Sequence, residues 1–312
     1  MRLLAVTLAL AAAAYSQTPN TIAFDGLSRS NPAPAFDHGY VAAWDLVQVH
    51  SLTLYDPSGA RLFDLTSLTL PDGTRTYTPD SVDIDSDGIS AYTWRAMFPR
   101  AGFALLDKTG KPLRIVETQP YAPSQICFAP DHSLWVFGQL WGPKTLEPDY
   151  PVFRHYSRDG KLLGAFVQRS TLPTYDGIGL DNLTGSFVGL WRLRASKDRL
   201  GAALLLGNGK SLWVELDFSG NLIGQWPLPH GMPLAFDENN TLYGGYWSED
   251  HHHYRLLVFD KSTGTWQPLP PHPPGLLIAA DGTRLVYQNG DQLRWTDPPA
   301  PLTQSASLAQ PR

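Results

Sequence analysis

The sequence predicts an all-β protein built from four-stranded antiparallel sheets, and its composition and recurrent turns support this. Charged residues make up 17% of the 312 residues, hydrophobic residues 43%, and Gly and Pro number 27 each. An average chain has about 25% charged residues, so this chain is poor in charge and rich in turn formers. These proportions exclude a coiled coil, a helical bundle and a disordered chain. The lone Cys127 excludes a disulfide scaffold, and its apolar neighbours predict buried packing.

One hairpin unit recurs along the chain, with alternating apolar residues on either side of an Asp-x-x-Gly turn or a variant of it. The Asp side chain caps its own turn and the Gly supplies the positive φ that closes it, which is typical of a β-hairpin. Its copies are LTLYDPSGARLFDL, FALLDKTGKPLRIV, FRHYSRDGKLLGAF, LWVELDFSGNLIGQW, LLVFDKSTGTWQPL and the weaker LVYQNGDQLRW.

A second hairpin unit alternates with the first and consists of an apolar strand, an acidic turn and another apolar strand. Its copies are APAFDHGYVAAW, VDIDSDGISAYTW, ICFAPDHSLWVFG, LRASKDRLGAALL, PLAFDENNTLYGG and LLIAADGTRLVYQ. Two hairpins per repeat make one four-stranded sheet, and six such repeats predict a six-bladed β-propeller of four-stranded antiparallel blades. A β-sandwich is the alternative, but it has far fewer strands than these hairpins require.

The succession of turns such as AFDENNTLYG followed by LVFDKSTG resembles the six-bladed propellers of the NHL and TolB-like group over nearly all of the chain beyond its first residues. The resemblance implies the fold and leaves the function open. The last repeat lacks one strand, and Thr21–Phe24 is the candidate to complete it. We expect the propeller to span residues 17–297 and residues 298–312 to form a disordered Pro-rich tail.

The first 16 residues, MRLLAVTLALAAAAYS, predict a secretory signal peptide cleaved between Ser16 and Gln17. A membrane anchor is the alternative, but the apolar run is shorter than the ~20 residues that a bilayer span needs. We therefore expect a secreted or periplasmic monomer without a membrane span. The net charge of -5, with no Lys/Arg run, argues against nucleic acid as a partner.

Strand direction alternates within a blade, so the tight turns fall on one face of the ring and the long connections on the other. Long loops on a rigid scaffold often carry function, and here they are rich in aromatic, basic and acidic residues. We predict a ligand surface on this long-loop face, where a protein, peptide or glycan would bind. The alternative, equally weighted, is that the aromatic residues pack between blades. The predicted surface residues are Trp94, Arg95, Arg100, Trp141, Tyr175, Asp176, Trp247 and His251.

One acidic turn is a candidate calcium site, because Asp83, Asp85 and Asp87 match the start of a D-x-D-x-D-G loop. The twelfth position of that loop is Trp94, where the helix-loop-helix motif has Glu, so an ordinary acidic turn is the alternative. No cofactor is otherwise predicted. The run of His251 to His253 is more typical of a solvated loop tip than of a metal site.

Two functions remain open from the sequence. The first is an exported binding scaffold that uses the long-loop face. The second is a metal-dependent hydrolase of the lactonase kind, with a site at the mouth of the central channel, as some propellers that this chain resembles have. The chain has no recognisable catalytic motif such as G-x-S-x-G or H-E-x-x-H, which favours the scaffold.

Overall fold

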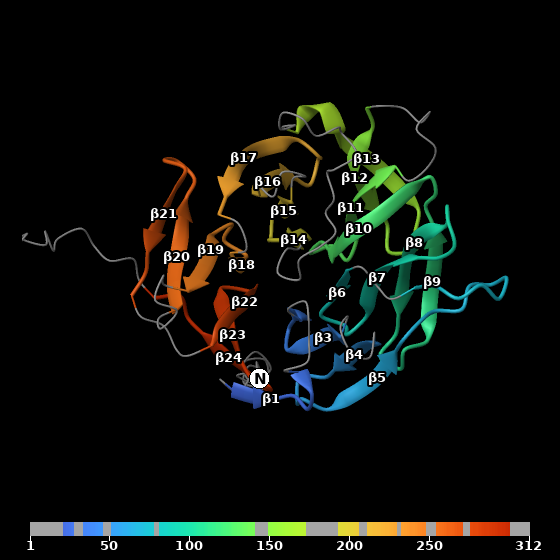
Figure 1. The fold of residues 1–312 in the computed structure, drawn as a ribbon, viewed down its shortest axis with the longest axis horizontal. Coiled ribbons are helices and arrows are strands. Elements are labelled where there is room, and N and C mark those ends of the chain that lie inside the picture. Colours follow the sequence, from blue (N-terminus) through green and yellow to red (C-terminus); the bar gives the residue numbers. More distant parts are fainter. Residues whose placement is uncertain are drawn as a thin grey trace, which may run out of the picture.

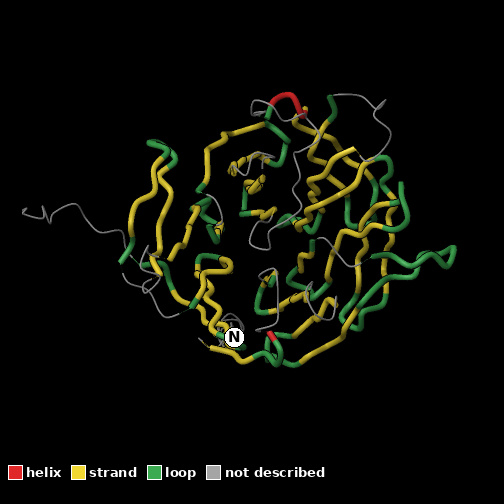
Figure 2. The backbone as a smooth tube through the Cα atoms, in the orientation of Figure 1, coloured by secondary structure: helices red, strands yellow, loops and turns green. Residues whose placement is uncertain are grey.

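The computed structural model describes residues 21–27, 34–45, 51–77, 81–140, 149–172, 193–205, 211–229, 232–247, 254–270 and 275–299. Its strands form six four-stranded antiparallel sheets, which are arranged as blades in a ring (Figure 1). The protein is therefore an all-β six-bladed propeller, as its repeated turns predict. Strands and loops make up nearly all of the described chain (Figure 2), together with the short 3-10 helix η2 (Arg169–Thr171).

Five blades are each a continuous stretch of four strands. Blade 1 contains β2 (Ala35–Asp37), β3 (Tyr40–Asp45), β4 (Ser51–Tyr55) and β5 (Arg61–Leu65). Blade 2 contains β6 (Val82–Ile84), β7 (Ser90–Arg95), β8 (Ala101–Leu106) and β9 (Pro112–Glu117). Blade 3 contains β10 (Tyr121–Phe128), β11 (Leu134–Leu140), β12 (Pro151–Tyr156) and β13 (Leu162–Gln168).

Blade 4 contains β14 (Leu193–Ala195), β15 (Arg199–Leu205), β16 (Ser211–Asp217) and β17 (Leu222–Leu228). Blade 5 contains β18 (Leu234–Phe236), β19 (Leu242–Trp247), β20 (Tyr254–Asp260) and β21 (Thr265–Pro268). Blade 6 contains β22 (Leu276–Asp281), β23 (Arg284–Asn289) and β24 (Gln292–Thr296), together with β1 (Thr21–Ala23) from the start of the chain.

The N-terminal strand closes the ring, as the missing strand of the last repeat predicts. Ile22 of β1 lies opposite Leu293 of β24, and the N–H of Phe24 donates to the carbonyl of Asp291 at 2.8 Å. The two strands lie side by side at the bottom of Figure 1. Phe24 is fully buried and its ring meets that of Tyr55 in blade 1 edge-on, at 5.5 Å between centroids. Ring closure therefore packs the paired strands β1 and β24 against blade 1.

The turns that follow Asp residues close in the manner the sequence predicts. In blade 1, Oδ1 of Asp56 accepts the N–H groups of Ser58 and Ala60, and Gly59 has a φ of +88°. A Cβ atom at Gly59 would lie 2.5 Å from the carbonyl oxygen of Ala23, so the turn also packs closely against the closing strand of blade 6. Glycine is thus required here both by the backbone conformation and by the neighbouring blade.

The core lies between successive blades, where large side chains fill the space between two sheets. Trp94, Trp135, Trp213 and Trp295 are each at most 1% exposed. The cluster around Trp94 joins residues of blade 1, such as Leu52, to those of blade 2. Cys127 is also buried, as predicted, and burial raises the pKa of its thiol well above the usual value. Within the described ranges no helix is long and apolar enough to cross a membrane.

Candidate functional site

The described part of the long-loop face is best defined in blade 2, where three of the predicted ligand residues lie. Trp94 and Arg95 end strand β7, and Arg100 directly precedes β8. Trp94 is fully buried in the cluster between blades 1 and 2, so its indole packs between sheets. Arg95 is partly exposed.

Arg100 holds two long loops together. Its Nη1 lies 2.6 Å from Oδ2 of Asp72 and 3.0 Å from Oγ1 of Thr74, and its Nη2 lies 2.5 Å from Oε1 of Glu117. Asp72 and Thr74 belong to a small hairpin within the connection from β5 to β6, in which Thr69 pairs with Arg75. This connection projects from the ring on the right-hand side of Figure 1. Arg100 therefore positions the hairpin against blade 2.

Beside this ion-pair network lies an exposed apolar surface that the sequence analysis did not select. Tyr77 is 60% exposed, Met97 75% and Phe98 54%. The N–H of Tyr77 donates to the carbonyl of Arg95 at 2.7 Å, which places Tyr77 beside the turn that carries the other two. We call these three residues the blade 2 surface. In the sequence, this surface was indicated only by two adjacent large apolar residues, Met97 and Phe98, inside a loop. The sequence analysis selected mainly Trp and charged residues and therefore missed them.

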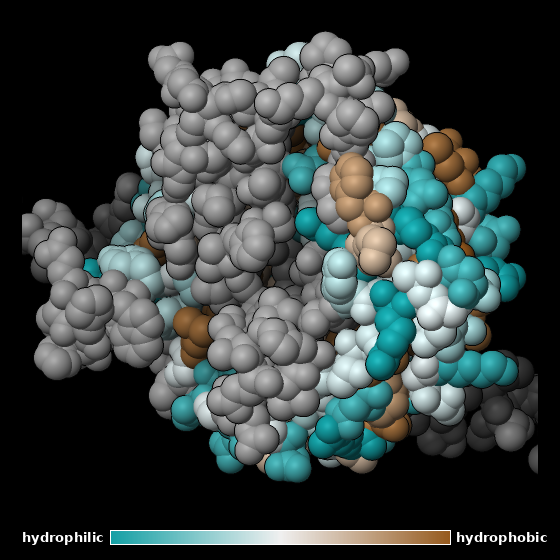
Figure 3. Space-filling model, turned by 45° about the vertical axis from the view of Figure 1, so that its right-hand side comes forward, coloured by the Kyte–Doolittle hydropathy of each residue, from teal (hydrophilic) through white to brown (hydrophobic). Residues whose placement is uncertain are grey.

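In the view of Figure 3, which brings the right-hand side of Figure 1 forward, the described surface is mostly hydrophilic, with small separate hydrophobic areas. Trp141, Tyr175, Asp176 and His251 lie outside the described residues, and Trp247 ends β19 with a side chain that is not described. For these five residues the ligand surface stays a prediction.

The acidic turn of blade 2 lies on the tight-turn face, close to the axis of the ring. Oδ1 of Asp83 lies 2.6 Å from Nη1 of Arg194 in blade 4, and its Oδ2 accepts the N–H of Phe128 in blade 3 at 2.9 Å. Asp83 thus connects three blades. Oδ1 of Asp85 accepts the N–H groups of Asp87 and Ile89, which closes the turn.

Ligand atoms of Asp85, Asp87 and His132 lie within 4.8 Å of one another, the geometry of a possible cation site. The guanidinium of Arg158 already pairs with both carboxylates, at 3.0 Å from Asp85 and 3.1 Å from Asp87. Asp83 is directed to Arg194 and is not part of this group. A divalent cation would have to displace Arg158, so the donor set fits calcium poorly, and calcium at this motif stays a prediction.

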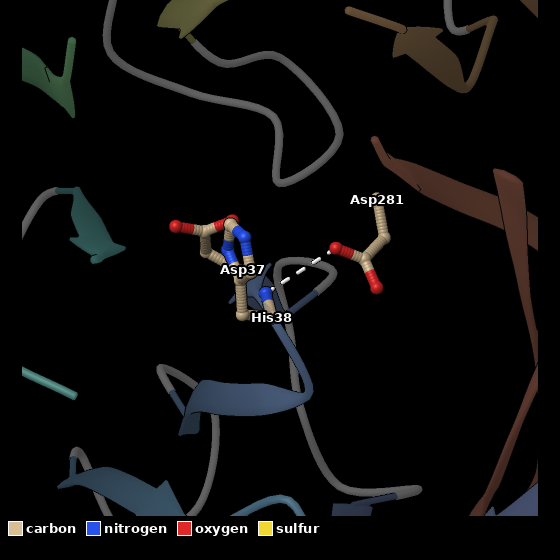
Figure 4. Close-up of side chains that lie close together, drawn as sticks. All are labelled: Asp37, His38 and Asp281. Carbon is tan, nitrogen blue, oxygen red and sulfur yellow. Dashed lines mark hydrogen bonds and ion pairs between the residues drawn. The ribbon is translucent and has the colours of Figure 1, made fainter. Parts of the chain in front are cut away.

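A second group of titratable residues lies where blade 6 meets blade 1. Nδ1 of His38 lies 2.6 Å from Oδ1 of Asp37, and the backbone N–H of His38 donates to Asp281 at 3.2 Å (Figure 4). The hydrogen bond with Asp37 raises the pKa of His38 to about 9. Asp281 also accepts a hydrogen bond from the indole N–H of Trp295. These contacts secure the junction at which the ring closes.

The turns between first and second strands line an open central cavity of about 320 Å³ on the tight-turn face. All six blades contribute to its lining, among them His38 from blade 1, Arg194 from blade 4 and Glu238 from blade 5. The sequence could not predict this assembly, because each blade adds only a few residues and the turns are far apart along the chain.

No protein-family model matches the chain, and no curated protein matches it. Solved structures do. A luciferin-regenerating enzyme is 13% identical with a TM-score of 0.46, covering 84% of each chain. The Dos1 propeller is 12% identical with a TM-score of 0.45, covering 86% of this chain and 67% of its own. The β-propeller domain of the trilobed protease from Pyrococcus furiosus is 9% identical with a TM-score of 0.44, covering 83% and 77%. At such identities these matches carry no argument about function.

Proposed function

We propose that this protein is an exported binding scaffold that holds a partner protein or peptide on its long-loop face, with the blade 2 surface as a contact site. The observation that carries the proposal is the exposure of Tyr77, Met97 and Phe98 on two neighbouring segments that the backbone hydrogen bond from Tyr77 to Arg95 joins. Aromatic residues, Met and Arg are enriched in protein–protein interfaces relative to the rest of the surface. Large apolar side chains that stay more than half exposed favour such a partner over water.

The surroundings of the blade 2 surface favour a partner with acidic groups. Arg75 is exposed on the neighbouring hairpin, and its Nε donates to Oγ of Ser67 at 3.2 Å. Among the described residues, no carboxylate forms an ion pair with Arg75. By contrast, the charge of Arg100 is neutralised by two carboxylates. Arg75 is therefore the cation that a carboxylate of the partner would meet beside Tyr77.

Contacts within the chain itself position the blade 2 surface, and such preorganisation lowers the entropy cost of binding. Leu68 and Leu70 anchor the base of the hairpin in the core between blades 1 and 2. Arg100 fixes its tip through Asp72, and the backbone bond from Tyr77 to Arg95 fixes its return to blade 2.

A metal-dependent hydrolase is supported less well by the described residues. The carboxylates that line the central cavity are largely engaged by cations of the chain itself: Asp83 by Arg194, Asp85 by Arg158 and Asp37 by His38. Export rests on the N-terminal segment, whose sequence pattern is that of a signal peptide.

The proposal is tested by selecting random peptides displayed on phage against the full chain and measuring their affinity for variants. We expect the selected peptides to be rich in acidic and apolar residues. We expect them to bind Phe98→Ser and Met97→Ser at least tenfold more weakly than the original protein, a loss of about 1.4 kcal/mol in binding free energy. Leu163→Ser is the matched control, since Leu163 is 52% exposed on the outer strand of blade 3.

Peptides that bind the Phe98→Ser and Met97→Ser variants as tightly as the original protein would show that the blade 2 surface is not the site. A glycan array probed with the same proteins forms a second arm. Glycan binding that is lost in Tyr77→Ala, without any peptide binding, would replace the protein partner with a carbohydrate.

A further inference from the structure

A histidine and two aspartates from the first and last blades come together where the ring closes. Asp37 ends β2, and His38 follows it in the inner turn of blade 1, while Asp281 ends β22 of blade 6 (Figure 4). One ligand atom of each residue lies within 4.8 Å of those of the other two. An imidazole nitrogen and two carboxylate oxygens form a donor set that suits divalent transition metals such as zinc.

The spacing of these three donors is close to the spacing around a metal ion. With bonds of about 2.1 Å, the ligands of a tetrahedral zinc ion lie about 3.4 Å from one another. Nδ1 of His38 and Oδ1 of Asp37 are 2.6 Å apart, and no pair in the group is more than 4.8 Å apart. Side-chain movements of at most about 1.5 Å would therefore bring all three donors to bonding distance. The side chains of His38 and Asp37 are 65% and 37% exposed, which leaves them room to turn.

Asp281 is the fixed member of the group. Its side chain is only 8% exposed, and its Oδ2 accepts the indole N–H of Trp295 at 3.0 Å. Its Oδ1 accepts the backbone N–H of His38 at 3.2 Å and keeps a second lone pair for a cation. Hydrogen bonds of this kind orient the carboxylates that bind metals in proteins. One donor is thus held by its own blade, and the two more exposed donors can close on it.

The charge around this group is negative. The hydrogen bond with Asp37 raises the pKa of His38, and the charges of Asp281 and Glu238 raise it further. Glu238 of blade 5 lies next to this junction, because its Oε2 would be 3.6 Å from a Cβ atom at Gly282. Among the described residues, Arg284 is the one Arg or Lys that pairs with the group, at 3.5 Å from Asp281. Three carboxylates therefore surround one imidazole, which favours a cation of higher charge than a proton.

This group differs from the acidic turn of blade 2 in what occupies the place of a cation. In that turn the guanidinium of Arg158 pairs with the carboxylates of both Asp85 and Asp87. Where blade 6 meets blade 1, no described guanidinium or ammonium group bridges the two carboxylates. A metal ion has to displace only the proton of His38 there, since metals bind the neutral imidazole.

We propose that Asp37, His38 and Asp281 bind a divalent transition metal ion, with zinc as the ion to be tested, and that this ion links blade 6 to blade 1. The ion coordinates an imidazole nitrogen and one oxygen of each carboxylate, and the proton of His38 passes to the solvent. Water from the open central cavity, which Asp37 and His38 line, completes the coordination.

The role of the ion is to hold the ring closed. The closing strand β1 has only three residues, so a metal ion between the first and last blades adds a second connection across the closure. The site lies on the tight-turn face, whereas the blade 2 surface lies on the long-loop face. The proposal therefore does not depend on the scaffold function.

Zinc binding and thermal unfolding of the full chain test the proposal. His251→Ala, His252→Ala and His253→Ala are introduced together as the background, so that these adjacent histidines cannot bind zinc themselves. We expect one zinc ion per chain, retained after dialysis and measured by mass spectrometry. We also expect the melting temperature to rise with the zinc concentration, because the ion binds the folded ring and not the unfolded chain.

Variants of the two exposed ligands locate the ion. His38→Ala and Asp37→Asn should each weaken zinc binding at least tenfold and abolish the rise in melting temperature. His132→Ala is the matched control, because His132 belongs to the acidic group of blades 2 and 3 and its side chain is 38% exposed. It should bind zinc as the background does. Calcium at the same concentration should not raise the melting temperature, since calcium prefers oxygen ligands.

Zinc that does not bind at micromolar concentration, or that binds His38→Ala and Asp37→Asn unchanged, would overturn the metal site. Loss of zinc in His132→Ala but not in His38→Ala would overturn it too, by placing the ion at the other group. Zinc that binds without raising the melting temperature would overturn the link between the blades. Phe98→Ser should leave zinc binding intact even if it abolishes peptide binding, so the two proposals can fail separately.

Discussion

Phe24→Ala should destabilise the propeller strongly, because Phe24 belongs to the segment that closes the ring. Its side chain is fully buried, and its ring meets that of Tyr55 edge-on at 5.5 Å. Phe→Ala substitutions in protein cores cost about 3–5 kcal/mol. About 0.5–1.5 kcal/mol of this is expected to come from the aromatic pair. We expect Phe24→Ala to cost the full 3–5 kcal/mol, because the closing segment has blades on both sides. These blades cannot move inward to fill the cavity that the missing ring leaves.

The assay is equilibrium unfolding in urea followed by tryptophan fluorescence, since four buried indoles report on the packing between blades. Phe98→Ala is the control, because its side chain is 54% exposed and its loss should change the free energy of unfolding by less than about 0.5 kcal/mol. A loss below about 1 kcal/mol for Phe24→Ala would refute the view that the N-terminal segment carries the closure of the ring.

Three further predictions concern charges and turns. Glu215→Gln should destabilise the protein in urea unfolding by less than the about 3–5 kcal/mol of a fully buried pair, because it removes the buried carboxylate charge that pairs with the partly exposed Lys261 at 2.5 Å and Arg199 at 3.3 Å. The stability that His38 contributes should be fully present below pH 6.5 and be lost as the pH rises through about 9, because folding raises the pKa of His38. An NMR titration should show that the pKa of His38 falls towards 6.5 in Asp37→Asn. Gly59→Ala should lower the melting temperature, because it combines a positive φ with a close approach to the next blade.

Two of these have a matched control variant. Lys261→Met in the Glu215→Gln background should recover part of the lost stability, because it removes a partly buried cation that has lost its carboxylate partner. Gly264→Ala shares the positive φ but has nothing within 4 Å of the added Cβ, so it should be milder than the substitution at Gly59. An unchanged His38 titration in Asp37→Asn, or equal effects of the two glycine substitutions, would contradict the contacts assigned to them.

Much of the fold followed from local turn chemistry. An Asp that caps its own turn and a Gly with positive φ mark a hairpin whatever surrounds it, and every predicted hairpin is present in the described sheets. The absence of a last strand in the sixth repeat also pointed to Thr21–Phe24, and pairing of β1 with β24 confirms this prediction.

The candidate sites followed much less from the sequence. Trp94 was selected as an exposed aromatic residue, yet it lies in the core, because a loop residue and a strand-end residue look alike in sequence. Arg100 is in a long loop as predicted, but its charge serves to hold Asp72 and Glu117. Burial and pairing depend on the neighbouring strand or blade, which local patterns do not reveal.

The sequence by itself determined that this chain forms hairpins, that they number enough for six blades and that its N-terminal segment is needed to complete the last one. Only the tertiary structure decided which charges are compensated: Asp83 of blade 2 and Arg194 of blade 4 form an ion pair, whereas Lys197 and Glu238, which also line the cavity, form no ion pair with any residue that the structure describes. The physical reason is that turn formation is settled by residues a few positions apart. Charge compensation near the axis depends instead on pairs such as Asp83 and Arg194, or Asp85 and Arg158, whose partners lie in different blades and meet only when the ring is assembled.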